Sequence, residues 1–104
     1  MSMRKYHEKL YYSSCNASCG NHDVTNVYNE NGVAVRRIFR YHGSAIVVMY
    51  PTESRVIIDN HGYSTISTSQ AIKGYLELLP SDFAVEYGPN HSGRKWDKNG
   101  KNPY

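Results

Sequence analysis

The residues best suited to metal chemistry lie in the first quarter of the chain. Cys15, Cys19 and His22 place two thiols and an imidazole close together, and His7 is a candidate fourth ligand for tetrahedral zinc. Structural zinc sites usually separate paired thiols by two residues and add a second pair of ligands, and this chain has neither feature. The sequence therefore favours a polar loop with two ordinary thiols, which can also oxidise to a disulfide.

The five histidines are scattered along the chain, and no two of them have the four-residue spacing of a helical zinc-protease motif. His61 is near enough in sequence to Asp59 to form a catalytic dyad, with Cys19 as another partner, but no motif positions a nucleophile beside it. The sequence has no glycine-rich phosphate loop and no paired-carboxylate signal. We therefore expect no catalytic residues, no cofactor and no metal, and a small metal-dependent enzyme is only the third functional hypothesis.

Basic residues indicate a different kind of site. Residues 1–90 contain eight Lys or Arg and eight Asp or Glu, so the net charge of +3 comes entirely from residues 91–104. The residues that we predict to bind a partner are three strand arginines and four tail residues, namely Arg36, Arg40, Arg55, Arg94, Lys95, Trp96 and Lys98.

Two kinds of partner fit these residues. Arginine, tryptophan and the ten tyrosines of this chain are residue types favoured at protein interfaces. Basic residues around a stacking aromatic ring can also follow a nucleic-acid backbone. The neutral balance of residues 1–90 favours a protein partner, and nucleic acid is the alternative.

Arg36 and Arg40 belong to the clearest part of the sequence. Three runs rich in β-branched and aromatic residues are separated by only two to four turn residues, which predicts consecutive antiparallel hairpins. They cover residues 33–41, 45–50 and 55–59. In the first run Arg37 interrupts an apolar face, and Arg36 and Arg40 share the other face, which we expect to be solvated. The second run is apolar on both faces, so we expect it to be central and covered by a helix on one side and by an aromatic or tail segment on the other.

One helix is well marked. Ser67 and Gln70 stand at capping-box spacing, so we expect the helix to begin near Ser67 or Thr68, and Pro80 ends it. Its apolar stripe consists of Ile72, Tyr75, Leu76 and Leu79. The stripe is predicted to pack on Val47, Met49, Val56 and Ile58, or on the alternate residues of the same strands. Weaker signals predict a short helix in residues 3–12, a turn-rich loop in 13–23, and strands in 24–28 and 83–87.

Together these elements predict an α+β domain over residues 1–90, with a small antiparallel meander of three to five strands packed by one main helix. Residues 1–32 are its least defined segment, and residues 91–104 form a basic tail. The longest apolar run, 44–50, is far shorter than the roughly 20 residues that span a bilayer. Two cysteines fit a reducing compartment. We therefore expect a cytoplasmic protein with no membrane partner.

Part of this pattern resembles a known group of proteins. The stretch 42–47, the strand 55–59 and the Gly-aromatic-x-Thr-x-x-Thr segment 62–68 with its following helix are similar to small uncharacterised bacteriophage accessory proteins. The resemblance covers about residues 33–79 and brings no catalytic residues. It implies a binding role, because small phage proteins of this kind often inhibit or redirect host machinery, including anti-defence proteins that block CRISPR effectors.

The first functional hypothesis is therefore a non-enzymatic, phage-encoded protein that binds a host protein in the host cytoplasm and modulates or inhibits it. The alternative is a small nucleic-acid-binding module that uses Arg36, Arg40 and the basic tail around Trp96.

Overall fold

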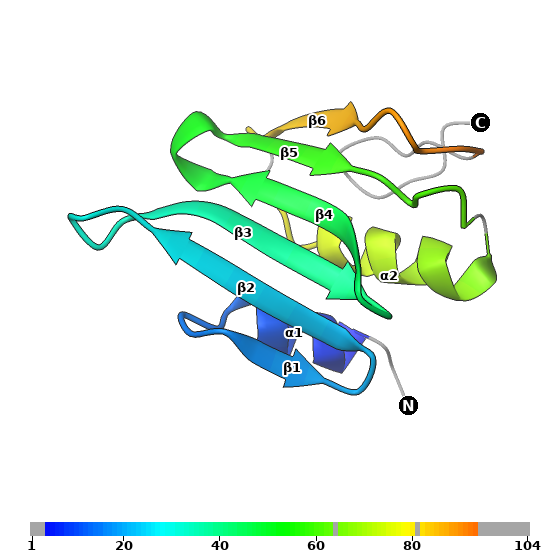
Figure 1. Cartoon of the computed structure of the whole chain (residues 1–104), viewed down its shortest axis with the longest axis horizontal. Coiled ribbons are helices and arrows are strands. Elements are labelled where there is room, and N and C mark those ends of the chain that lie inside the picture. The colour runs from blue at the N-terminus through cyan, green and yellow to red at the C-terminus, as the bar shows by residue number, and fades with distance from the viewer. Residues whose placement is uncertain (1–3, 64, 81, 94–104) are drawn as a thin grey trace.

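The computed structural model describes residues 4–63, 65–80 and 82–93. One six-stranded sheet is ordered β1-β2-β3-β4-β5-β6, and two α-helices lie behind it in the view of Figure 1. The elements are α1 (Arg4–Tyr11), β1 (Ala17–Cys19), β2 (His22–Tyr28), β3 (Ala34–Tyr41), β4 (Ser44–Tyr50), the 3-10 turn η1 (Pro51–Glu53), β5 (Arg55–Ile58), α2 (Ile66–Leu76) and β6 (Ala84–Tyr87). The α+β class and the central meander β3-β4-β5 are confirmed.

The predicted number of three to five strands is too low, because the segment expected to be a loop contains β1. This strand has only three residues and pairs with the start of β2, so that Cys19 lies opposite His22. Gly20, at φ 62°, helps to form the two-residue turn between them. A three-residue strand of small and polar side chains has no alternating pattern by which the sequence could reveal it.

The prediction of a wholly antiparallel sheet is wrong at β6. β5 and β6 are parallel, with Val56 opposite Val85 and Ile58 opposite Tyr87. Parallel neighbours need a long crossover connection, and α2 supplies it. The molecule is therefore an antiparallel meander that ends in one β-α-β unit.

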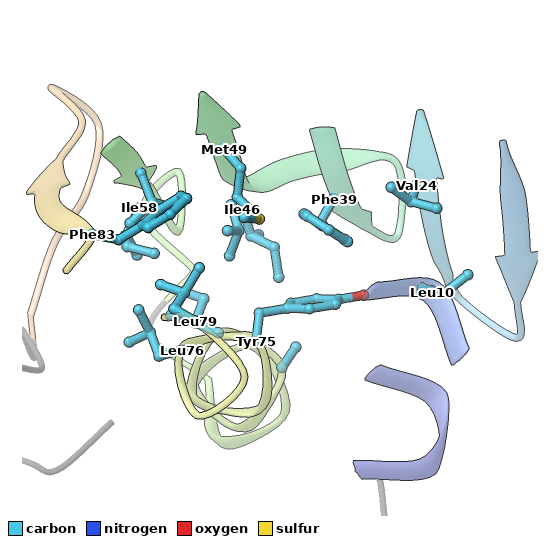
Figure 2. Close-up of a cluster of buried hydrophobic side chains, with 14 residues drawn as sticks. Leu10, Val24, Phe39, Ile46, Met49, Ile58, Tyr75, Leu76, Leu79 and Phe83 are labelled. Atoms are coloured by element: carbon cyan, nitrogen blue, oxygen red, sulfur yellow. The ribbon is translucent and has the colours of Figure 1, made fainter. Parts of the chain in front are cut away.

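The buried core lies between α2 and the central strands. Figure 2 shows Tyr75, Leu76 and Leu79 directed toward side chains of the sheet. The predicted packing is confirmed, because the whole helical stripe and its four predicted strand partners belong to one buried cluster. Ile46 also points inward, since a bulge in the β3-β4 pairing leaves it without a partner of its own and places Ile46 and Val47 consecutively in the core.

The start of α2 differs from the expected one. The helix begins at Ile66, and its N-cap is Thr65, whose hydroxyl accepts a hydrogen bond from the Thr68 amide at 3.2 Å. The predicted capping box of Ser67 and Gln70 is therefore not the helix start, because Thr65, two residues before Ser67, is the N-cap. α2 ends at Leu76, and hydrogen-bonded turns follow it up to Pro80.

α1 packs beside α2 on the same face of the sheet, and two residues explain how closely it fits. A Cβ atom at Gly74 would lie 2.6 Å from atoms of the His7 ring, so only glycine leaves room for that imidazole. Arg37 donates to the carbonyl oxygens of Leu10 and Ser13, at 3.1 and 3.0 Å, and to Asn26 at 2.7 Å. Arg37 interrupts the apolar face of β3 because it binds the carbonyl groups at the end of α1, where a cation is favoured.

The chain after β6 is held by the loop that follows β5. The Asn60 side chain donates to the Ser92 carbonyl at 2.7 Å and accepts from the Ser92 amide at 3.0 Å, and the Asp59 carboxylate accepts from the Asn90 amide at 3.1 Å. The Asn60 backbone amide also donates to Nδ1 of His91 at 3.1 Å, so His91 and Ser92, which the sequence assigned to the tail, are bonded to the domain. No helix of the described residues is long and apolar enough to cross a membrane.

Candidate binding face

The two faces of the sheet are covered unequally. Side chains alternate between the faces along a strand, and Phe39 belongs to the helix-covered core, so Arg36, Ile38 and Arg40 point to the opposite side. Within the part of the chain that the structure describes, neither helix packs over that side, which faces the viewer in Figure 1. We call it the open face. The covering aromatic or tail segment that we expected over β4 is not found among the described residues.

Strand register identifies the side chains of the open face. Thr25 pairs with Ile38, Ile38 with Val48, Val48 with Ile57, and Ile57 with Glu86, which makes one row across five strands. The open face consists of this row and of the neighbours that share its orientation, namely Ser18, Asp23, Val27, Arg36, Arg40, Ala45, Tyr50, Arg55 and Ala84.

The centre of the open face is apolar. Ile38, Val48 and Ile57 are adjacent in the row, and each is only half-buried, by its neighbours in the sheet. Core residues one position away on the same strands, such as Val47 and Ile58, are fully buried. The sheet therefore presents three adjacent aliphatic side chains that no described element covers.

The structure brings the three predicted strand arginines onto this one face. Arg40 lies 3.3 Å from the Asp23 carboxylate, and Arg55 lies 2.8 Å from Glu53 and 2.7 Å from Glu86. Arg36 is exposed and makes no ion pair with any residue that the structure describes. The four predicted tail residues, Arg94, Lys95, Trp96 and Lys98, lie outside the described residues.

Arg55 is the most constrained of the three. Glu86 and Glu53 raise the pKa of its guanidinium, which stays charged throughout the working range of pH. Its Cζ also lies 4.9 Å from the centre of the Tyr50 ring, a cation-π contact. Charges on the open face are thus largely compensated within the chain, and the rim is polar without being strongly basic.

A second polar region lies at the end of the sheet where β3 turns into β4 and where α2 begins. A pocket of about 370 Å³ is lined there by Tyr41, His42, Ser44, Tyr63, Thr65, Ser67 and Thr68. The pocket combines aromatic rings with hydroxyl groups, which suits weak contacts with small polar molecules.

Two histidines are buried close to this pocket. The His7 and His22 rings lie 5.2 Å apart, and the His22 and Tyr41 rings 4.7 Å apart. Burial, and then the neighbouring His7 and His42, lower the pKa of His22 to about 4, so its ring is neutral at pH 7. Its ordinary role is therefore that of a neutral core side chain.

The structure brings three of the four metal-ligand candidates near one another, with Cys19 opposite His22 and the His7 ring 5.2 Å from the His22 ring. Cys15 and Cys19 are both free thiols, and Cys15 is exposed. Among the described residues, no group of three or more histidine, cysteine or acidic side chains is arranged so that it could hold a metal ion.

His61 and Asp59 do come together, with Nδ1 of the histidine 3.9 Å from Oδ1 of the aspartate. Both groups also bind loop backbone. Asp59 accepts from the His61 and Asn90 amides, and Nε2 of His61 lies 2.6 Å from the Ala45 carbonyl oxygen. The pair therefore ties the loop after β5 to the start of β4 and to the chain after β6.

No protein-family model, no curated protein and no solved structure matches this chain. The resemblance to small phage proteins therefore stays a prediction.

The strand pattern predicts Arg36, Arg40 and Ile38 on one face of β3, but it did not reveal that Val48 and Ile57 extend Ile38 into an uncovered apolar centre. The signal was present, because residues 45–49 are apolar on both faces, but the second face was assigned to an aromatic or tail segment that is not found over it among the described residues. Glu86 was missed for another reason. Glu86 lies in the row because β6 pairs in parallel with β5, and no local sequence pattern predicts that pairing.

Proposed function

We propose that this protein is a non-enzymatic binding protein that recognises another protein through the open face of its sheet. One observation carries the proposal. Ile38, Val48 and Ile57 form an apolar row on a face that no described element covers. Charged and aromatic side chains, Arg36, Arg40, Tyr50 and Arg55, surround that row. Protein interfaces combine an apolar centre with a polar rim and are enriched in arginine and tyrosine.

The resemblance to bacteriophage accessory proteins supports a narrower proposal about the partner. We propose that the partner is a host protein that this chain modulates or inhibits in the host cytoplasm, with a component of host defence such as a CRISPR effector as one candidate. The basic tail residues Arg94, Lys95, Trp96 and Lys98 are proposed to add contacts beyond the sheet.

Nucleic acid is the second candidate partner, and one observation favours it. Three arginines and Tyr50 share an open sheet face, which is an arrangement that can track a single strand and stack a base. The charges weigh against it, since Arg40 and Arg55 are paired with carboxylates of the same chain. Nucleic-acid surfaces depend on positive charge that is free to neutralise phosphates. A protein partner is therefore favoured.

The test is capture of partners from host lysate, with and without nuclease, by three forms of the protein. Wild type is compared with Val48→Lys at the centre of the open face and with Val33→Lys, a matched change at an exposed residue before β3. We expect a nuclease-resistant protein to be captured by wild type and V33K and lost with V48K, while thermal unfolding shows that all three fold. Equal capture by all three would contradict the proposal, and nuclease-sensitive capture would support nucleic acid.

A further inference from the structure

The open face has two halves of opposite charge. The half formed by β2 and β3 carries Arg36 and Arg40 against Asp23. The half beside β5 and β6 carries Arg55 against Glu53 and Glu86. The first half is net positive. The second half is net negative when Glu53 is counted, which reaches Arg55 from the neighbouring turn η1. The apolar row lies across the centre.

We infer that the open face of the free protein is covered by a second copy of the same chain, packed face to face about a two-fold axis. This inference rests on the proposed binding face and names its occupant. A two-fold interface must be self-complementary, since each patch meets its symmetry mate. A face that is positive on one side and negative on the other meets that condition when the axis passes between the two halves.

The strand order fixes where the axis has to lie. An axis parallel to the strands between β4 and β5 places β4 of one copy on β5 of the other, and β3 on β6. Val48 then meets Ile57 of the second copy, so the apolar centres pack together. Packed sheets cross at about 30°, which preserves this correspondence near the centre of the interface.

The charged residues correspond in the same arrangement. Arg36 and Arg40 lie two residues on either side of Ile38 along β3, about 7 Å from its row. Glu86 lies in that row. The two arginines of one copy therefore straddle Glu86 of the other, and the same contact forms a second time by symmetry. Arg36, which has no ion pair among the described residues, would gain a carboxylate partner.

Sedimentation velocity of the full chain in low salt tests the inference with two charge-reversal variants. Wild type is expected to be a dimer, and Arg36→Glu and Glu86→Lys, each of which places like charges in contact, are expected to weaken dimerisation by roughly tenfold or more. Mixing the two variants should restore dimers, because one of the two symmetric contacts then regains its native charges. Glu30→Lys, in the exposed turn before β3, is the control for net charge and should dimerise as wild type does.

Three results would overturn the inference. Wild type could stay monomeric up to about 100 µM, where even a weak specific dimer is populated. The mixture could fail to restore dimers although both variants melt as wild type does. If either charge-reversal variant is unfolded, sedimentation of V48K is compared with that of V33K instead. A V48K protein that still dimerises would contradict a dimer interface on the open face.

These outcomes are separable from failure of the proposed function. If the wild type is monomeric and V48K abolishes partner capture, only the inferred dimer is wrong, and the partner-binding proposal stands. If V48K disrupts the dimer but leaves partner capture unchanged, the partner-binding proposal is wrong and the inferred dimer stands.

Discussion

The two faces of the sheet use the same strands for different purposes. On one face, Phe39, Val47 and Ile58 are fully buried beneath α2 and define the core. On the other, Ile38, Val48 and Ile57 occupy the alternate positions of the same three strands and remain half-exposed. Arginine shows the same division, because Arg37 is bound to the end of α1 whereas Arg36 is exposed. Neighbouring residues thus separate into those that stabilise the fold and those that are available for binding.

The largest expected effect is in the core. Leu76→Ala should lower the free energy of unfolding by about 2 to 5 kcal/mol, because a fully buried side chain is lost and leaves a cavity. Val48→Ala on the open face should cost roughly 1 kcal/mol or less, since that side chain is already partly solvated. Urea denaturation of both variants measures the difference. The comparison is made at a protein concentration low enough to keep both variants monomeric, and equal losses there would show that the chain itself covers the open face as tightly as the core.

Acid should weaken the covered side specifically through His22. The unfolded chain binds a proton at His22 near pH 6.5, whereas the folded protein resists it until about pH 4, so stability falls as the pH decreases between these values. The loss should reach on the order of 3 kcal/mol at pH 4. Urea denaturation between pH 7 and pH 4 measures the slope, and His22→Gln should flatten it. An unchanged slope in the variant would show that other groups cause the acid sensitivity.

The two neighbouring arginines provide a matched pair. Arg37→Lys should cost about 1.5 to 3 kcal/mol, because a lysine ammonium cannot bond Asn26 and the carbonyls of Leu10 and Ser13 with the same geometry. Arg36→Lys, on the exposed side of the same strand, should change stability by less than about 0.5 kcal/mol. Thermal unfolding of the two variants measures the two changes in stability. A larger loss of stability in Arg36→Lys than in Arg37→Lys would show that the two faces were assigned the wrong way round.

A smaller effect is expected at the end of the chain. A protein ending after Asn90 loses the bonds of Asn60 to His91 and Ser92, and should be less stable by about 1 to 2 kcal/mol than one ending after Gly93. Both should fold. If partner binding by the protein ending after Gly93 equals that of the full chain at every salt concentration, the predicted role of Arg94, Lys95, Trp96 and Lys98 is wrong. A loss that is largest at low salt supports it.

Much of the covered side could be read from local periodicity. The stripe of α2 and the two-sided apolar run of β4 are strong patterns, and the short turns between β3, β4 and β5 allow only hairpins. The bulge at Ile46, the three-residue β1 and the parallel return of β6 could not be read in this way. Each depends on contacts between distant segments, which is why Glu86 joined the open face only in three dimensions.

Binding on the open face can be tested most directly by methyl resonances, which report on the two faces of the sheet separately. In spectra of the protein with and without its captured partner, and across a dilution series, the methyl groups of Ile38, Val48 and Ile57 should shift. Those of the core residues Ile46, Val47 and Ile58 should stay nearly unchanged. Shifts confined to core methyls or to residues around the Tyr41 and Tyr63 pocket, with the open-face methyls unmoved, would show that binding occurs elsewhere on the protein.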